Sequence, residues 1–158
     1  AAPAGDNAEL VFVADDAQLL RFDASSVRPQ GRSAGGMAGI RLSDGARAIA
    51  FAVVGASAFD AVVVTVAGSS AALAGTDAGS AKVSAFTEFP AKGRATGGVR
   101  AQRLLRGEDA LVLAWVGTEP RAVGTDGSVR ALPEPGAKRD ASGQPLDASV
   151  GAIGTVVR

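Results

Sequence analysis

The residues best suited to chemistry in this sequence are arginines set among glycines. Residues 31–37 are Gly-Arg-Ser-Ala-Gly-Gly-Met, and residues 93–99 repeat the pattern as Gly-Arg-Ala-Thr-Gly-Gly-Val. A guanidinium binds phosphate oxygens through a rigid fork of donors, and neighbouring glycines let backbone N–H groups approach an anion closely. The pattern therefore predicts phosphate binding, with Arg32 and Arg94 at equivalent positions.

Positive charge gathers on these loops although the whole chain is neutral, with 16 basic and 16 acidic residues. Residues 92–106 contain five basic side chains and no acid, whereas residues 1–23 contain five acids and one arginine. A neutral chain has no strong overall field, so binding to a polyanion must depend on this local asymmetry.

Enzyme chemistry has few candidate residues here. The chain has no cysteine, histidine or tyrosine, which removes the usual thiolate, imidazole and phenol groups of catalytic and metal sites. The remaining possibilities are a Ser–Lys pair, in a chain with only three lysines, or a carboxylate pair, Asp15 with Asp16 or Glu108 with Asp109. Adjacent residues in a turn usually point apart into water. We expect no catalytic residue, no metal site and no cofactor.

The elements that carry the loops have the pattern of short strands. Hydrophobic residues make up 47% of the chain, and glycine interrupts nearly every window in which a helical period could develop. Alternating or continuous apolar runs, bounded by turns such as Ser43-Asp44-Gly45 and Asp126-Gly127, predict strands at 9–14, 18–22, 48–54, 61–66, 82–86, 99–104, 110–116, 121–125 and 128–132. The Gly/Ala/Ser/Thr-rich segment 67–81 is predicted to be a long flexible loop.

These strands fall into three similar units, approximately residues 9–55, 60–117 and 120–157. The third is the weakest and has Lys138-Arg139 where the glycine–arginine loop would stand. Repeated units of about four short strands predict one propeller-like all-β domain, residues 1–158, whole or as a fragment of a longer protein. A sandwich or barrel of about ten strands fits the strand count equally well. The residues alone leave three roles open: a nucleic-acid binder, a protein-binding array or a structural domain.

The repeat resembles a known family. Each of the first two units has a strand pair, then Gly-Arg-x-x-Gly-Gly-Val/Met, then Arg-x-Leu, an acidic turn and an apolar strand. This order is similar to the blade of the C-terminal domain of the A subunit of bacterial type IIA topoisomerases, DNA gyrase and topoisomerase IV. The match is closest in the second unit and covers most of residues 9–157.

The resemblance implies a β-pinwheel of about three four-stranded blades whose basic rim binds and bends duplex DNA. It implies an accessory domain of an ATP-dependent enzyme, without an active site of its own, in the cytoplasm with the nucleoid. Its partners would be duplex DNA, the ATPase subunit, the remainder of the topoisomerase A subunit, and no membrane. The alternative is a propeller-like protein-interaction module that binds no DNA. The predicted phosphate contacts are Arg32, Arg41, Lys82, Lys92, Arg94, Arg100, Arg103 and Arg130.

The sequence departs from the family in two ways. Gyrases carry a Gln-Arg-Arg-Gly-Gly box in one blade, and the run at residues 30–36 keeps the glutamine and glycines but lacks the second arginine. This favours topoisomerase IV or a gyrase-like paralogue. Three units are also fewer than the family's usual five or six, which indicates a fragment or a shortened domain.

Overall fold

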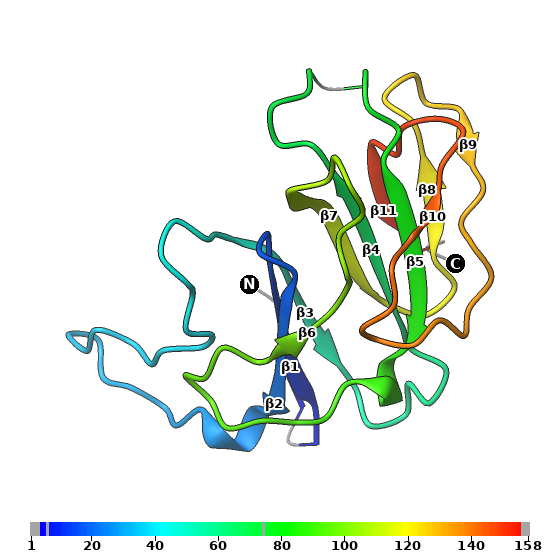
Figure 1. The fold of residues 1–158 in the computed structure, drawn as a ribbon. Coiled ribbons are helices and arrows are strands. Elements are labelled where there is room, and N and C mark those ends of the chain that lie inside the picture. The colour runs from blue at the N-terminus through cyan, green and yellow to red at the C-terminus, as the bar shows by residue number, and fades with distance from the viewer. Residues whose placement is uncertain (1–3, 6, 74, 156–158) are drawn as a thin grey trace.

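The structure, a computed structural model, describes residues 4–5, 7–73 and 75–155, and its regular secondary structure is almost entirely β-strand, joined by long loops (Figure 1). The helices in this part of the chain are two three-residue 3-10 turns, η1 (Ala24–Ser26) and η2 (Phe86–Glu88). None of its helices is long and apolar enough to cross a membrane. The predicted all-β class is confirmed.

The first sheet has four antiparallel strands in the order β3-β1-β2-β6. Strands β1 (Glu9–Ala14) and β2 (Gln18–Asp23) form a hairpin, and β3 (Ala48–Val54) pairs with the other side of β1. The fourth strand, β6 (Val99–Arg100), comes from the second glycine–arginine loop.

The second sheet repeats this arrangement in the order β10-β5-β4-β7. Strands β4 (Val62–Gly68) and β5 (Ser80–Ala85) form the hairpin, and β7 (Ala110–Gly117) pairs with β4. Its fourth strand, β10 (Gln144–Pro145), comes from the third unit.

The third sheet has three strands among the described residues, in the order β11-β8-β9. They are β8 (Arg121–Val123), β9 (Val129–Arg130) and β11 (Ala152–Gly154). The array is therefore two four-stranded sheets and one three-stranded sheet, which excludes the single sandwich or barrel.

Sheets and sequence units do not coincide. The units 9–55 and 60–117 each supply three strands of one sheet, and the following unit supplies the fourth. Each sheet is thus tied to its successor by hydrogen bonds as well as by the chain.

Two apolar layers hold the sheets together. All seven residues of β4 are buried because both faces of the second sheet are covered. On one face of the second sheet, Val63 and Leu111 lie in one apolar cluster with Val11 and Leu19 of the first sheet. On the other, the second sheet packs against the third through a cluster of Val62, Val64, Val83, Trp115, Leu132 and Ile153. Trp115 is partly buried in this second cluster.

Strand boundaries differ from the sequence prediction where the pattern was weak. The predicted strand 99–104 contracts to two residues, and β4 and β5 extend into the segment predicted to be a flexible loop. The short strands β10 and β11 were not predicted. Phe59 is 89% exposed and Phe51 46%, so these two phenylalanines are not core residues.

Candidate nucleic-acid interface

The two repeated glycine–arginine loops lie directly against each other. The backbone N–H of Ala95 donates to the carbonyl of Gly39 at 2.6 Å, and the N–H of Arg41 donates to the carbonyl of Thr96 at 3.0 Å. The guanidinium of Arg94 reaches across to the carbonyl of Ala38 at 2.7 Å. Two loops that are far apart in the sequence are thereby held on one surface.

The same contact recurs one unit further along. Arg103, equivalent to Arg41 by the repeat, donates its backbone N–H to the carbonyl of Ala141 at 3.0 Å. Beside it, the Arg139 guanidinium donates to the carbonyl of Arg100 at 3.3 Å. The three loops therefore follow one another in order, each bonded to the next. We call this continuous strip, residues 31–42, 92–103 and 138–142, the loop track.

The second loop is also fixed to the first sheet. The N–H of Lys92 donates to the carbonyl of Arg21 at 3.0 Å, and the N–H of Ala101 donates to that of Ala17 at 2.7 Å. Between these two bonds the chain leaves the sheet and returns to it as β6. The side chains on the loop are thus carried by a backbone anchored at both ends.

Six of the eight predicted cations lie on the loop track with their charges unpaired. Five are exposed and Arg94 is half-buried. Within the described part of the chain, no carboxylate lies within ion-pair distance of any of the six. They are Arg32, Arg41, Lys92, Arg94, Arg100 and Arg103.

Lys82 is not on this surface, and its prediction as a phosphate contact needs correction. Its side chain is only 2% exposed, because β5 lies inside the second sheet. Its ammonium donates to the carbonyls of Ala101, Arg139 and Lys138, the last at 3.1 Å. Burial lowers the pKa of Lys82 from 10.5 to about 8. The residue holds the loops of two units together and presents no charge to solvent.

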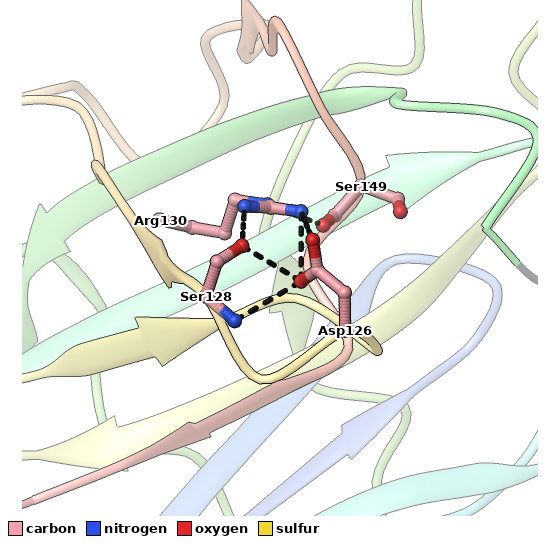
Figure 2. Close-up of polar contacts among 4 residues, drawn as sticks. All are labelled: Asp126, Ser128, Arg130 and Ser149. Atoms are coloured by element: carbon pink, nitrogen blue, oxygen red, sulfur yellow. Dashed lines mark hydrogen bonds and ion pairs between the residues drawn. The ribbon is translucent and has the colours of Figure 1, made fainter.

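Arg130 is held within its own turn (Figure 2). Its guanidinium pairs with Asp126 at 3.1 Å and donates to the carbonyl of Ser149 at 3.1 Å. Hydrogen bonds from Ser128, together with Arg130, lower the pKa of Asp126 to about 2. This arrangement neutralises Arg130 and fixes the turn between β8 and β9.

Sequence reasoning did not include Arg139 among the candidate contacts. The third loop has drifted from the glycine–arginine pattern, yet Arg139 lies beside Arg100 on the loop track. Its position in the third unit, where the repeat predicts a basic loop, could have identified it as a candidate.

Three of the four carboxylates considered for catalysis make structural contacts, whereas Oδ1 of Asp16 is buried without a hydrogen-bond partner in the described part of the chain. Asp15 accepts the backbone N–H of Arg47 at 2.8 Å, and Glu108 accepts that of Leu105 at 2.6 Å. Hydrogen bonds from Ser70 lower the pKa of Asp109. No group of acidic residues in the described ranges has the geometry to hold a metal ion. Asp15, Glu108 and Asp109 therefore stabilise loops and turns.

A model of the family described as "DNA gyrase C-terminal domain, beta-propeller" matches residues 8–55 and 72–114, which belong to the first two units. "Topoisomerase subunit TopoM" of Mycolicibacterium smegmatis is 35% identical over 108 residues, 68% of this chain and 14% of the relative. The DNA gyrase A protein of Aeromonas salmonicida is 39% identical over 75 residues, 48% of this chain and 7% of the relative. The chain thus spans a small part of the length of these curated relatives.

Solved structures share the fold. The C-terminal domain of DNA topoisomerase IV superposes with a TM-score of 0.71 at 19% identity, over 94% of this chain and 46% of that one. The E. coli ParC C-terminal domain gives 0.69 at 15% identity, over 95% and 61%. The DNA gyrase A C-terminal domain gives 0.61 at 16% identity, over 97% and 50%. At these identities the likeness establishes architecture, the β-pinwheel.

Proposed function

The chain belongs to the DNA gyrase C-terminal domain family, and on that premise we propose that it is a non-catalytic module that binds duplex DNA through its phosphates. The observation that carries the proposal is the loop track, on which hydrogen bonds align three basic loops and six cations have no carboxylate within ion-pair distance among the described residues. Such a strip can contact successive phosphates without reading bases.

The chemistry of the track suits a sequence-independent binder. Arginine offers several donors to phosphate oxygens, and each phosphate that it neutralises releases counterions from the duplex. With six cations engaged, the logarithm of the binding constant should fall against the logarithm of salt concentration with a slope of about −5. Contacts from successive units of the array would bend the duplex along the track.

In the longer protein we place this module beside the remainder of a topoisomerase A subunit, which works with its ATPase subunit in the cytoplasm with the nucleoid. It would bind duplex DNA and present it to a catalytic core that lies outside this chain. The curated relatives, which are named as parts of a topoisomerase and of DNA gyrase, support this placement.

The test is charge reversal at the equivalent positions Arg41 and Arg103. Both side chains are exposed, so replacing them should leave the fold intact. The double variant Arg41→Glu/Arg103→Glu should bind duplex DNA about 100-fold more weakly in a low-salt titration, with a salt slope shallower by about 2.

The matched control reverses a single cation away from the track. Arg121 on β8 is exposed, and Arg121→Glu makes the same charge change as Arg103→Glu alone. The proposal requires a much larger loss of affinity for Arg103→Glu than for Arg121→Glu. Equal losses, or binding that is insensitive to salt, would favour the alternative protein-interaction module.

A further inference from the structure

A series of side-chain hydrogen bonds runs through the interior beside the second basic loop. The Thr65 hydroxyl on β4 donates to Oε1 of Gln102 at 2.7 Å, and Nε2 of Gln102 donates to the Ser80 hydroxyl on β5 at 3.2 Å. The Ser80 hydroxyl donates to Oε1 of Glu108, whose Oε2 accepts the backbone N–H of Leu105 at 2.6 Å. We call the four side chains of Thr65, Gln102, Ser80 and Glu108 the polar network.

The polar network occupies a place where an apolar side chain also fits. Thr65 and Ser80 are 0% exposed and Gln102 is 1% exposed, and buried hydroxyl and amide groups cost free energy unless they are hydrogen-bonded. By the repeat, the first basic loop has Ile40, a partly buried apolar residue, at the position of Gln102. Burial alone therefore does not require a glutamine here.

The polar network holds the backbone of the second basic loop. Ala101 and Gln102 are buried, whereas Arg100 and Arg103 on either side of them are exposed. The network leaves the loop at Gln102 and returns to it at the N–H of Leu105, two residues beyond Arg103. The backbone that carries Arg103 is thus bound to the interior on both sides.

The third basic loop lies against the same network. A Cβ on Gly143 would lie 2.5 Å from the Ser80 hydroxyl and 2.8 Å from Nε2 of Gln102, so the backbone there approaches both side chains closely. The N–H of Arg103 also donates to the carbonyl of Ala141 at 3.0 Å. The polar network therefore lies at the junction of the second and third basic loops.

Hydrogen bonds restrict this junction more than apolar contacts would, because they weaken steeply when the donor or acceptor turns away. Gln102 is bonded through both ends of its amide, to Thr65 on one strand and to Ser80 on the next. Its side chain cannot rotate or slide without breaking one of these bonds. The exposed neighbours of Gln102 in the sequence are thus attached to a fixed support.

We propose that Gln102, held by the polar network, is a positioning residue for DNA binding, which fixes the directions in which Arg100 and Arg103 leave the loop track. This inference rests on the proposed function. Gln102 is buried and contacts no phosphate itself, so it acts through the two arginines. Arginines that are already ordered lose less conformational entropy when they engage phosphates, which strengthens binding.

The variant Gln102→Leu fills the space and breaks the polar network at its centre. It should bind duplex DNA about tenfold more weakly in a low-salt titration, because two arginines must then be ordered on binding. In an Arg100→Ala/Arg103→Ala background the same substitution should cause no further loss. An equal loss in both backgrounds would show that Gln102 does not act through these arginines and would overturn the proposal.

Two substitutions of Thr65 separate positioning from stability. Thr65→Val keeps the shape but removes the donor to Gln102, whereas Thr65→Ser keeps the donor and removes a buried methyl group. Thr65→Val should bind duplex DNA about threefold more weakly or worse. Thr65→Ser should bind like the wild type although its melting temperature falls, since deleting a buried methyl group destabilises a core. Equal affinities for the two variants would contradict a positioning role.

Amide hydrogen exchange without DNA distinguishes a failure of this proposal from a failure of the proposed function. In Gln102→Leu, the amides of Arg103 and Leu105 should exchange about tenfold faster than in the wild type, while that of Val64 inside β4 should stay protected. Unchanged exchange at Arg103 and Leu105 would overturn the proposal. A wild-type protein that binds no duplex would instead refute the proposed function, and the exchange rates would still decide whether the polar network holds the loop.

Discussion

Lys82 is a buried cation whose partners are all backbone carbonyls. It lies on β5 and its ammonium joins Ala101 of the second basic loop to Lys138 and Arg139 of the third. A buried carbonyl without a donor costs free energy. The ammonium supplies a donor to the carbonyls of Ala101 and Arg139, whereas the carbonyl of Lys138 also accepts the backbone N–H of Ala141. Lys82 therefore connects the second and third units through hydrogen bonds.

We predict that Lys82→Met destabilises the protein by about 2–4 kcal/mol at neutral pH, because methionine fills the space but gives the buried carbonyls of Ala101 and Arg139 no donor. Urea unfolding measures this loss. The control Lys92→Met, at an exposed side chain, should change stability by no more than about 0.5 kcal/mol.

The wild-type protein and Lys82→Met should also differ in how the free energy of unfolding depends on pH. Burial lowers the pKa of Lys82 to about 8, whereas the unfolded chain keeps its proton up to about 10.5. In that window the unfolded state binds more protons, so the free energy of unfolding should rise with pH in the wild type relative to Lys82→Met. Parallel curves for the two proteins would show that Lys82 titrates normally in the fold.

At the scale of the elements, the first two sheets each take their fourth strand, β6 or β10, from the following unit. These two strands are short, yet they connect neighbouring units. Strand β6 is only two residues long, yet with the bonds of Lys92 and Ala101 it ties the second unit to the first sheet. Its position depends on Gly98, whose positive φ and closeness to Leu19 leave no space for a side chain.

Gly98→Ala should therefore cost about 2 kcal/mol or more, through both the strained φ and the clash with the Leu19 carbonyl. Gly36, at the equivalent position of the first basic loop, has a similar φ of +79°, and a Cβ there would meet no described atom within 4 Å. Gly36→Ala should therefore cost only about 1 kcal/mol, from the strained φ alone. Chemical denaturation of the two variants compares these losses. Equal losses would mean that the close approach at Gly98 contributes nothing beyond backbone strain.

Local patterning in the sequence predicted the strands that build the cores, because their apolar runs are long enough to show. Strands β1, β3, β4 and β7 fall where the pattern placed them. Strands β10 and β11 have two and three residues, too few to show a period. The exchange of fourth strands is a pairing between distant segments, which local patterning does not encode.

The site was predictable to the same extent. The repeat placed Arg32, Arg41, Arg94 and Arg103 on equivalent loops, and the structure brings those loops together. The sequence repeat could not show that Lys82, unlike these arginines, is buried, because a lysine in an alternating strand is normally a surface residue. Lys82 is buried because the segments that contain Ala101 and Lys138 cross over it.

For the whole molecule, the balance of charge matters less than its placement. The net charge is zero, but several acids are engaged in turns, as Asp126 is with Ser128 and Arg130. Six cations of the first two basic loops have no carboxylate within ion-pair distance in the described part of the chain, whereas Lys138 of the third pairs with Glu88. A local basic strip on a neutral body would bind phosphates without the broad attraction of a highly charged protein.

We predict that the domain bends the duplex it binds. Duplexes shorter than about 150 bp resist closure into circles, so a bound bend should speed their ligation into minicircles, by about tenfold or more. The Arg41→Glu/Arg103→Glu variant, at the same concentration, should have little effect. Tight binding with unchanged circle formation would mean that the duplex lies straight on the protein.

Because β6 and β10 come from the following unit, they also determine when each of the first two sheets can be completed during synthesis. A ribosome releases the chain from its N-terminus, and the first sheet lacks its outermost strand until residues 99–100 have emerged. The second sheet must likewise wait for residues 144–145. Each sheet is completed only after much of its successor has been translated, so nascent copies expose unfinished β edges for longer than a chain of self-contained repeats would.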